Sequence, residues 1–87
     1  MADSSSIHVT RKDPNLKKLQ KRYRKEKDAE IVRRLGIIIH MIILDSVTEV
    51  ANFDAISDDT VRRWVKIFND GGLEALAKKN EADDPQF

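Results

Sequence analysis

The stretch that most constrains the fold of this chain runs over residues 57–69, where apolar side chains recur at the spacing of one helix face. Positions i, i+3, i+4 and i+7 form a single stripe along a helix, and here they are Val61, Trp64, Val65 and Phe68. Ser57 stands at the expected N-cap, and Asp58 and Asp59 fill the first turn, where carboxylates suit the positive end of the helix dipole. The Gly-Gly pair that follows supplies the left-handed backbone that ends a helix. The pattern predicts a helix with one buried face.

A shorter helix is expected immediately before it, over residues 48–53, with a tight turn at Ile56. Ala51 is small where the two helices would cross. We expect Phe53 to take the apolar position ahead of the turn and Asp54 to adopt the turn conformation, because Asp tolerates left-handed backbone better than most residues. Two helices joined in this way form a helix-turn-helix, in which the second is the recognition helix.

Several short motifs in this region occur together in one known family. They are TVRRW at 60–64, Phe68, GGLEAL at 71–76, and Val50-Ala51 ahead of the turn, with KRYRKEKDAEIVRRL at 21–35 as a lead-in helix. With these motifs, residues 30–76 resemble the N-terminal helix-turn-helix domain of mariner-like and related bacterial insertion-sequence transposases. The resemblance implies an all-α, homeodomain-like three-helix core that binds DNA, with an extra N-terminal basic helix and disordered ends. The chain departs from the family pattern where Ala55 replaces the usual turn glycine.

Two further helices are expected ahead of the motif. Residues 16–25 form a basic helix with a thin apolar stripe, and residues 30–44 form a central helix with more apolar positions than one stripe holds. The isoleucine-rich run also suits a strand, but its helical spacing and the resemblance favour a helix. We expect Trp64 to be buried against it through Ile38, Ile39 or Ile42. The surplus apolar surface of the central helix predicts self-association. A second copy of the chain, forming a homodimer, is therefore an expected partner.

The expected organisation is therefore a disordered arm with a basic end over residues 1–15, a helix-turn-helix domain over residues 16–77, and a disordered tail over residues 78–87. At 87 residues the chain is too short for a DNA-binding module together with a nuclease core, so it is not expected to be an enzyme. The longest apolar-rich run has ten residues, against about 20 for a membrane span.

Composition narrows the cofactors and the compartment. The chain has no Cys and two His, so neither a metal site nor another cofactor is expected, and no small-molecule substrate. The absence of Cys also fits a reducing cytoplasm.

Charge is strongly segregated, although the net charge is only +1. Residues 11–34 hold eleven Lys and Arg against four acids, whereas residues 45–60 hold five acids and no base. Double-stranded DNA is the expected partner. The residues expected to lie against its bases are Ser57, Asp58, Asp59, Arg62, Arg63 and Lys66. Those expected to contact phosphates are Lys21, Arg22, Arg24 and Arg33.

Several functions remain open at this stage. A DNA-binding module could be a transposase-type domain or a small transcriptional regulator. The alternative is a protein-protein interaction or dimerisation domain on the same fold, with DNA binding weakened by the acidic turn. A remnant without function is a third reading. The charged residues of both sets could also be solvated helix-face charges, which need no ligand.

Overall fold

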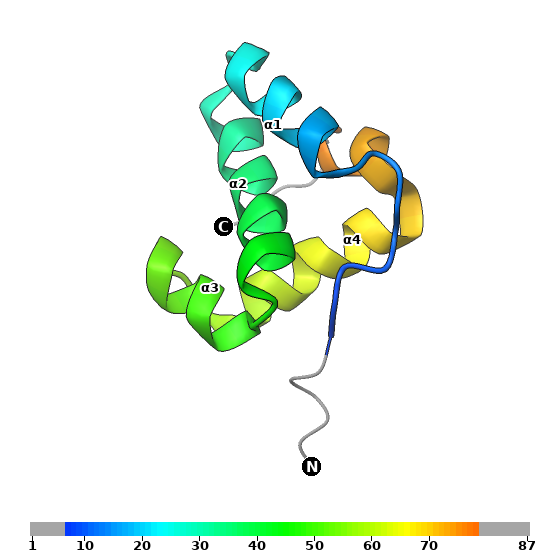
Figure 1. Cartoon of the computed structure of the whole chain (residues 1–87). Helices are drawn as coiled ribbons and strands as arrows, with labels where there is room; N and C mark the ends of the chain where they lie inside the picture. The colour runs from blue at the N-terminus through cyan, green and yellow to red at the C-terminus, as the bar shows by residue number, and fades with distance from the viewer. Residues whose placement is uncertain (1–6, 79–87) are drawn as a thin grey trace.

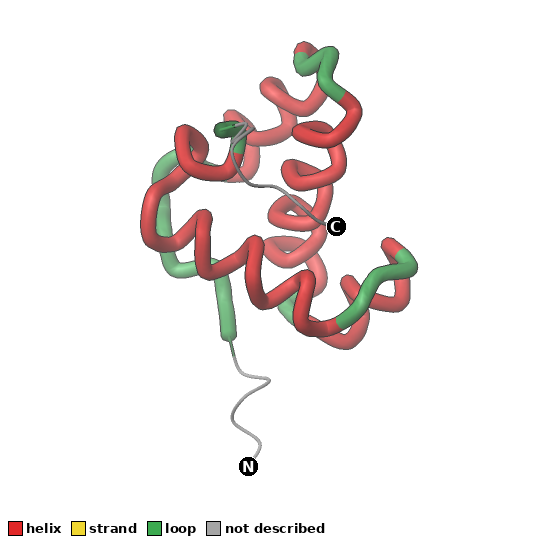
Figure 2. The backbone as a smooth tube through the Cα atoms, turned by 180° about the vertical axis from the view of Figure 1, so that it is seen from behind, coloured by secondary structure: helices red, strands yellow, loops and turns green. Residues whose placement is uncertain are grey.

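The computed structural model describes residues 7–78, and these residues form four helices and no strand. The helices are α1 (Leu16–Lys25), α2 (Ala29–Leu44), α3 (Val47–Asp54) and α4 (Asp58–Leu76). α2 is central, because α1, α3 and α4 all pack against it, and α3 also packs on α4 (Figures 1 and 2). The all-α fold and the helical state of the isoleucine-rich run are therefore confirmed. No helix within residues 7–78 is long and apolar enough to cross a membrane.

Each helix begins at a polar side chain that caps it. Asn15, Asp28, Ser46 and Ser57 each accept a hydrogen bond from a backbone N–H in the first turn of the helix that follows. Such a cap satisfies one of the N–H groups that lack an intrahelical partner. The expected cap at Ser57 is confirmed, with the N–H of Thr60 as donor.

Left-handed or kinked backbone ends the later helices. α2 is followed by Asp45 at φ 52° and α3 by Ala55 at φ 58°. Within α4, Gly72 has φ 74° and ψ −161°, which interrupts the helix before a short final turn. The combination of φ and ψ found at Gly72 is almost confined to glycine. The regular part of α4 therefore stops at the Gly-Gly pair, as its sequence indicates.

The turn between α3 and α4 differs from the sequence expectation. Ala55, and not Asp54, takes the left-handed conformation, and Asp54 remains the last residue of α3. The Asp54 carboxylate contacts Nδ1 of His40 at 3.1 Å, which places it against α2. Phe53 does not fill an apolar position, because 69% of its surface is exposed. The expectation that Phe53 takes the apolar position and Asp54 the turn conformation is thus wrong.

The core contains apolar residues from all four helices. The fully buried side chains include Leu19 of α1, Leu35 and Ile38 of α2, Val50 of α3, and Val61, Val65 and Phe68 of α4. Trp64 was expected to be buried with them, but it is only partly buried at the edge of the core. The Arg34 guanidinium covers its ring at 4.5 Å from the centroid. Trp64 therefore packs against the core on one side and has a charged side chain of α2 over its ring.

Part of the segment that was expected to be a disordered arm lies against the helices. Ile7 and Val9 pack against the core. The backbone N–H of Thr10 donates to Oδ1 of Asn69, and Nδ2 of Asn69 donates to the carbonyl of His8, each at 2.9 Å. Residues 7–15 therefore run along α4 (Figure 1). The rest of the expected arm, residues 1–6, and residues 79–87 of the expected tail lie outside the described residues.

Candidate nucleic-acid interface

The exposed face of α4 brings most of the expected DNA-contacting residues together. Asp59, Arg63 and Lys66 are exposed and follow one another at helical spacing, on the side opposite the buried Val61 and Val65. Asp58 is exposed in the same first turn. From residue 58 to the kink the helix is about 20 Å long, a length that lies comfortably in a major groove.

Three expected contact residues already have partners in the fold. The hydroxyl of Ser57 accepts from the N–H of Thr60 at 3.2 Å and contacts the Thr60 hydroxyl at 2.9 Å. Arg62 is partly buried and donates through Nη2 to Asp59 at 2.8 Å. This ion pair sits in water, because 90% of the Asp59 side chain is exposed, so it adds little stability. Asp59 nevertheless neutralises the charge of Arg62. Arg63 and Lys66 are therefore the main source of attraction to phosphates on this face.

Arg11 holds the far end of the same helix. Its Nε donates to the carbonyl of Phe68 at 3.1 Å, and its Nη2 donates to the carbonyl of Asp70 at 3.4 Å. These carbonyls lie in the last turn before the kink, where a cation complements the negative end of the helix dipole. Together with the Ser57 cap, Arg11 fixes both ends of the recognition helix.

Sequence reasoning missed this role of the arm, although a signal was present. Ile7, Val9 and Arg11 are half-buried, and the residues between them are exposed. Alternation with a period of two is typical of an extended segment lying on a surface. Asn69 was also missed as an anchor: its side-chain oxygen accepts from the backbone of the arm, and its side-chain nitrogen donates to it.

The four residues expected to contact phosphates lie elsewhere. Lys21, Arg22 and Arg24 are on α1, and Arg33 is near the start of α2. Figure 1 shows α1 and the start of α2 at the opposite end of the molecule from α3 and the start of α4. Arg22 lines a hollow beside the last turn of α4, from Gly71 to Lys78, and Arg24 lines another between α1 and α2. The structure therefore does not gather this set around the recognition helix.

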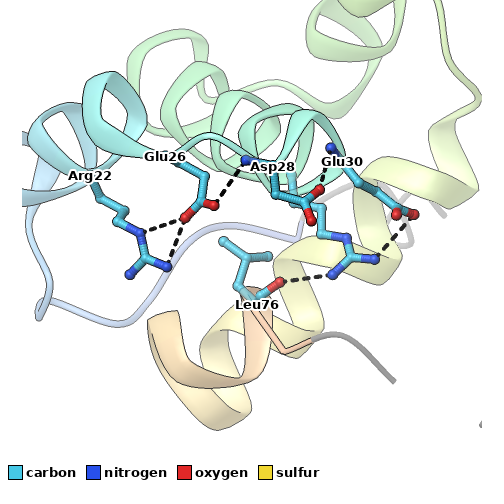
Figure 3. A network of polar contacts seen from close by, with 6 residues as sticks. Arg22, Glu26, Asp28, Glu30 and Leu76 are labelled. Atoms are coloured by element: carbon cyan, nitrogen blue, oxygen red, sulfur yellow. Dashed lines mark hydrogen bonds and ion pairs between the residues drawn. The ribbon is translucent and has the colours of Figure 1, made fainter. Parts of the chain in front are cut away.

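A polar network at the junction of α1 and α2 accounts for part of that basic set. Arg22 contacts the Glu26 carboxylate at 2.9 Å through Nε and again through Nη2, and the N–H of Asp28 donates to Glu26 at 3.1 Å (Figure 3). The hydrogen bond from the Asp28 N–H, followed by that from Arg22, lowers the pKa of Glu26, because both favour the charged carboxylate. Arg22 is thus part of the connection between two helices.

Arg34 extends this network to the end of α4. It pairs with Glu30 at 3.3 Å and donates through Nη1 to the carbonyl of Leu76 at 3.2 Å (Figure 3). The same Nη1 donates to the carbonyl of Lys78 at 3.1 Å. With its contact to Trp64, Arg34 ties α2 to both halves of the kinked α4. In the part of the chain that the structure describes, no three His, Cys, Asp or Glu side chains come together as a metal site.

Comparison with known proteins gives one match. A family model described as winged helix-turn helix matches residues 33–86, which is more than half of the chain. The match takes in most of α2 and all of α3 and α4, and its residues 79–86 lie outside the described part. No curated protein and no solved structure matches the chain.

Proposed function

Because the chain belongs to the winged helix-turn-helix family, we propose that it binds double-stranded DNA with α4 as the recognition helix. The observation that carries this proposal is the two-sided character of α4. Val61, Val65 and Phe68 are fully buried on the scaffold, and this places Arg63 and Lys66 together on the solvent side of a helix fixed at both ends. A rigid helix with an accessible polar face is what major-groove readout requires.

The residues of α4 have different roles in this proposal. Arg63 can donate two hydrogen bonds to one guanine, and Lys66 reaches a base edge or a phosphate one turn further along. Asp58 and Asp59 accept hydrogen bonds from cytosine amino groups, and elsewhere they repel phosphates. Arg62 exchanges its contact with Asp59 for a contact with DNA. Ser57 keeps its capping role and directs the start of the helix towards the duplex.

The basic residues of α1 act at longer range. Lys21, Arg22, Arg24 and Arg33 lie at the other end of the fold from Ser57, so we assign them no base contact. They contribute to the positive field that attracts a duplex, and they reach phosphates only where DNA extends beyond the recognition helix.

Within this class, the resemblance of residues 30–76 to transposase N-terminal domains supports a transposase-type DNA-binding domain. A small transcriptional regulator is the other member of the class. In either role the module itself is non-catalytic and acts in the cytoplasm, which fits the absence of Cys. A protein-interaction domain is the second candidate, because the carboxylates at the start of α4 weaken attraction to phosphates.

Fluorescence anisotropy with a labelled random duplex, at about 50 and 200 mM salt, tests the proposal. We expect affinity to fall with salt, and Arg63→Ala or Lys66→Ala to weaken binding about tenfold, since each removes a cation that lies directly against the duplex. Lys25→Ala is the matched control, because it removes the same charge from an exposed site on α1, and it should change affinity less than twofold. Binding that ignores salt, or an Arg63 variant no weaker than the control, would contradict the proposal.

A second variant tests the acidic first turn. Replacing Asp58 and Asp59 together by Asn removes two repulsive charges, so affinity for random duplex should rise and the preference between sequences should flatten. If this double variant binds no better than the parent, and the parent itself shows no salt-dependent binding, the protein-interaction function is favoured instead.

A further inference from the structure

A second surface, away from the exposed face of α4, gathers large apolar side chains in contact with water. Tyr23 of α1, Ile43 of α2 and Phe53 of α3 are 42%, 57% and 69% exposed. His40 lies among them, and its ring meets the ring of Phe53 edge to face with centroids 4.8 Å apart. We call Tyr23, Gly36, His40, Ile43 and Phe53 the outer face. Exposed apolar residues that cluster in this way mark a binding surface.

A hollow of about 290 Å³ occupies one end of the outer face. Its lining residues are Gln20, Tyr23, Arg24, Gly36, Ile39 and His40. Gly36 leaves space there, because it has no side chain, and a Cβ at this position would meet Tyr23 Cε1 only at 3.6 Å. A planar apolar ring suits such a hollow in size and chemistry.

The arrangement is self-complementary around His40. His40 lines the hollow, and its ring also contacts Phe53. A rotation of 180° about an axis close to His40 therefore carries Phe53 of one chain towards the hollow of the other, and the reverse. We propose that the outer face joins two copies of this chain, with each Phe53 seated in the hollow of the second copy. A contact in which the same patch serves both partners is isologous, as in most symmetric dimers.

The charges beside the outer face support a second copy as its occupant. Arg24 lies at the hollow, and Glu49 is exposed one helical turn before Phe53. The same rotation brings Arg24 of each copy towards Glu49 of the other. The segregation of charge along the chain, basic over residues 11–34 and acidic over residues 45–60, gives this pairing attraction at both ends. A parallel pairing would oppose like charges.

The contact should be modest in strength. A patch of a few large side chains buries less area than the roughly 1,200 Å² typical of stable complexes, so we expect a dissociation constant in the micromolar range. The exposed residues Arg63 and Lys66 of α4 are not part of the outer face. Association and DNA binding are therefore separable in this design.

Sedimentation equilibrium of the full chain, from about 5 to 500 µM, tests the proposal. We expect the parent to be a monomer–dimer mixture and Phe53→Asp to weaken association by about tenfold or more, as for a central aromatic anchor. Gly36→Leu, which fills the hollow, should act in the same direction. A parent that is monomeric throughout, or a folded Phe53→Asp variant that associates unchanged, overturns the proposal.

Charge reversal provides a test that leaves the apolar residues intact. Arg24→Glu and Glu49→Arg should each weaken association, and the double variant should restore it, since the reversed pair again attracts. Lys25→Glu is the matched control, with the same change of charge on α1 but outside the hollow, and should leave association within about twofold. Failure of the double variant to recover, or an equal loss in the control, would exclude the paired arrangement. Circular dichroism of each variant confirms that it is folded.

Discussion

Replacement of Arg34 by Met should destabilise the domain more than its surface chemistry suggests. Only 13% of the Arg34 side chain is exposed, and its guanidinium contacts Trp64, two carbonyls at the end of α4 and Glu30. The partly buried cation–π contact is worth about 1 kcal/mol. Each hydrogen bond from the guanidinium to a carbonyl adds about 1.5 kcal/mol. Part of this loss is recovered in the variant, because water can reach the freed carbonyls. The buried Nε has no partner within the described residues, which returns about 1 kcal/mol.

The net loss is therefore about 2 kcal/mol, because Met retains the packing of the aliphatic stem. In a domain of this size that loss lowers the midpoint of thermal unfolding by about 8–16 °C. Circular dichroism at the helix minimum measures the midpoint. Trp64 is the single tryptophan, so it is the source of the tryptophan fluorescence. Its emission should shift to longer wavelength, because the ring loses the cover of the Arg34 guanidinium. Arg33→Met is the matched control, as Arg33 is exposed one residue earlier. A loss below about 0.5 kcal/mol, or equal to the control, would show that Arg34 does not hold α4.

Two further predictions concern the backbone and pH. Gly72→Ala should cost about 1–3 kcal/mol, since its backbone conformation is almost confined to glycine. Gly36→Ala, in a regular helix, should be neutral or stabilising by up to about 1 kcal/mol. Equal thermal midpoints for Gly72→Ala and Gly36→Ala would contradict the glycine-specific backbone at Gly72. Hydrogen bonds from the Asp28 N–H and from Arg22 hold the pKa of Glu26 below its ordinary value. The charged carboxylate therefore stabilises the fold at pH values above the ordinary pKa. This stabilisation is lost as the pH falls through the lower pKa of the folded state. Urea unfolding of Glu26→Gln should depend less on pH across this acidic window, and an unchanged dependence would exclude the effect.

The helices could be predicted from the sequence because their signals are local. α1 has the bounds that its composition and apolar spacing indicate, and Ser57 caps α4 as its position implies. The side chains of α4 that point into the core also follow from their spacing, apart from Trp64. Capping and periodicity act within one or two turns of the same helix, so they are visible without a fold.

The features that were missed depend on partners distant in the sequence. Asp54 stays in α3, where its carboxylate contacts His40, and Trp64 lies at the edge of the core with Arg34 across its ring. The position of residues 7–15 on the fold depends on Asn69, which lies about 60 positions further along the chain. No local propensity reports such contacts, so the turn and the dispersal of the basic residues emerged only from the tertiary structure, and the alternation over residues 7–11 indicates an extended arm without naming what it contacts.

The most direct test of the central claim is to map the DNA contact residue by residue. Amide chemical shifts of the isotopically labelled full chain would be followed by nuclear magnetic resonance during titration with a short duplex. If α4 is the recognition helix, the largest changes should fall on residues 58–70, with side-chain changes at Arg63 and Lys66. Largest changes at Tyr23, His40 and Phe53, or no changes at all, would contradict a DNA-binding role for α4.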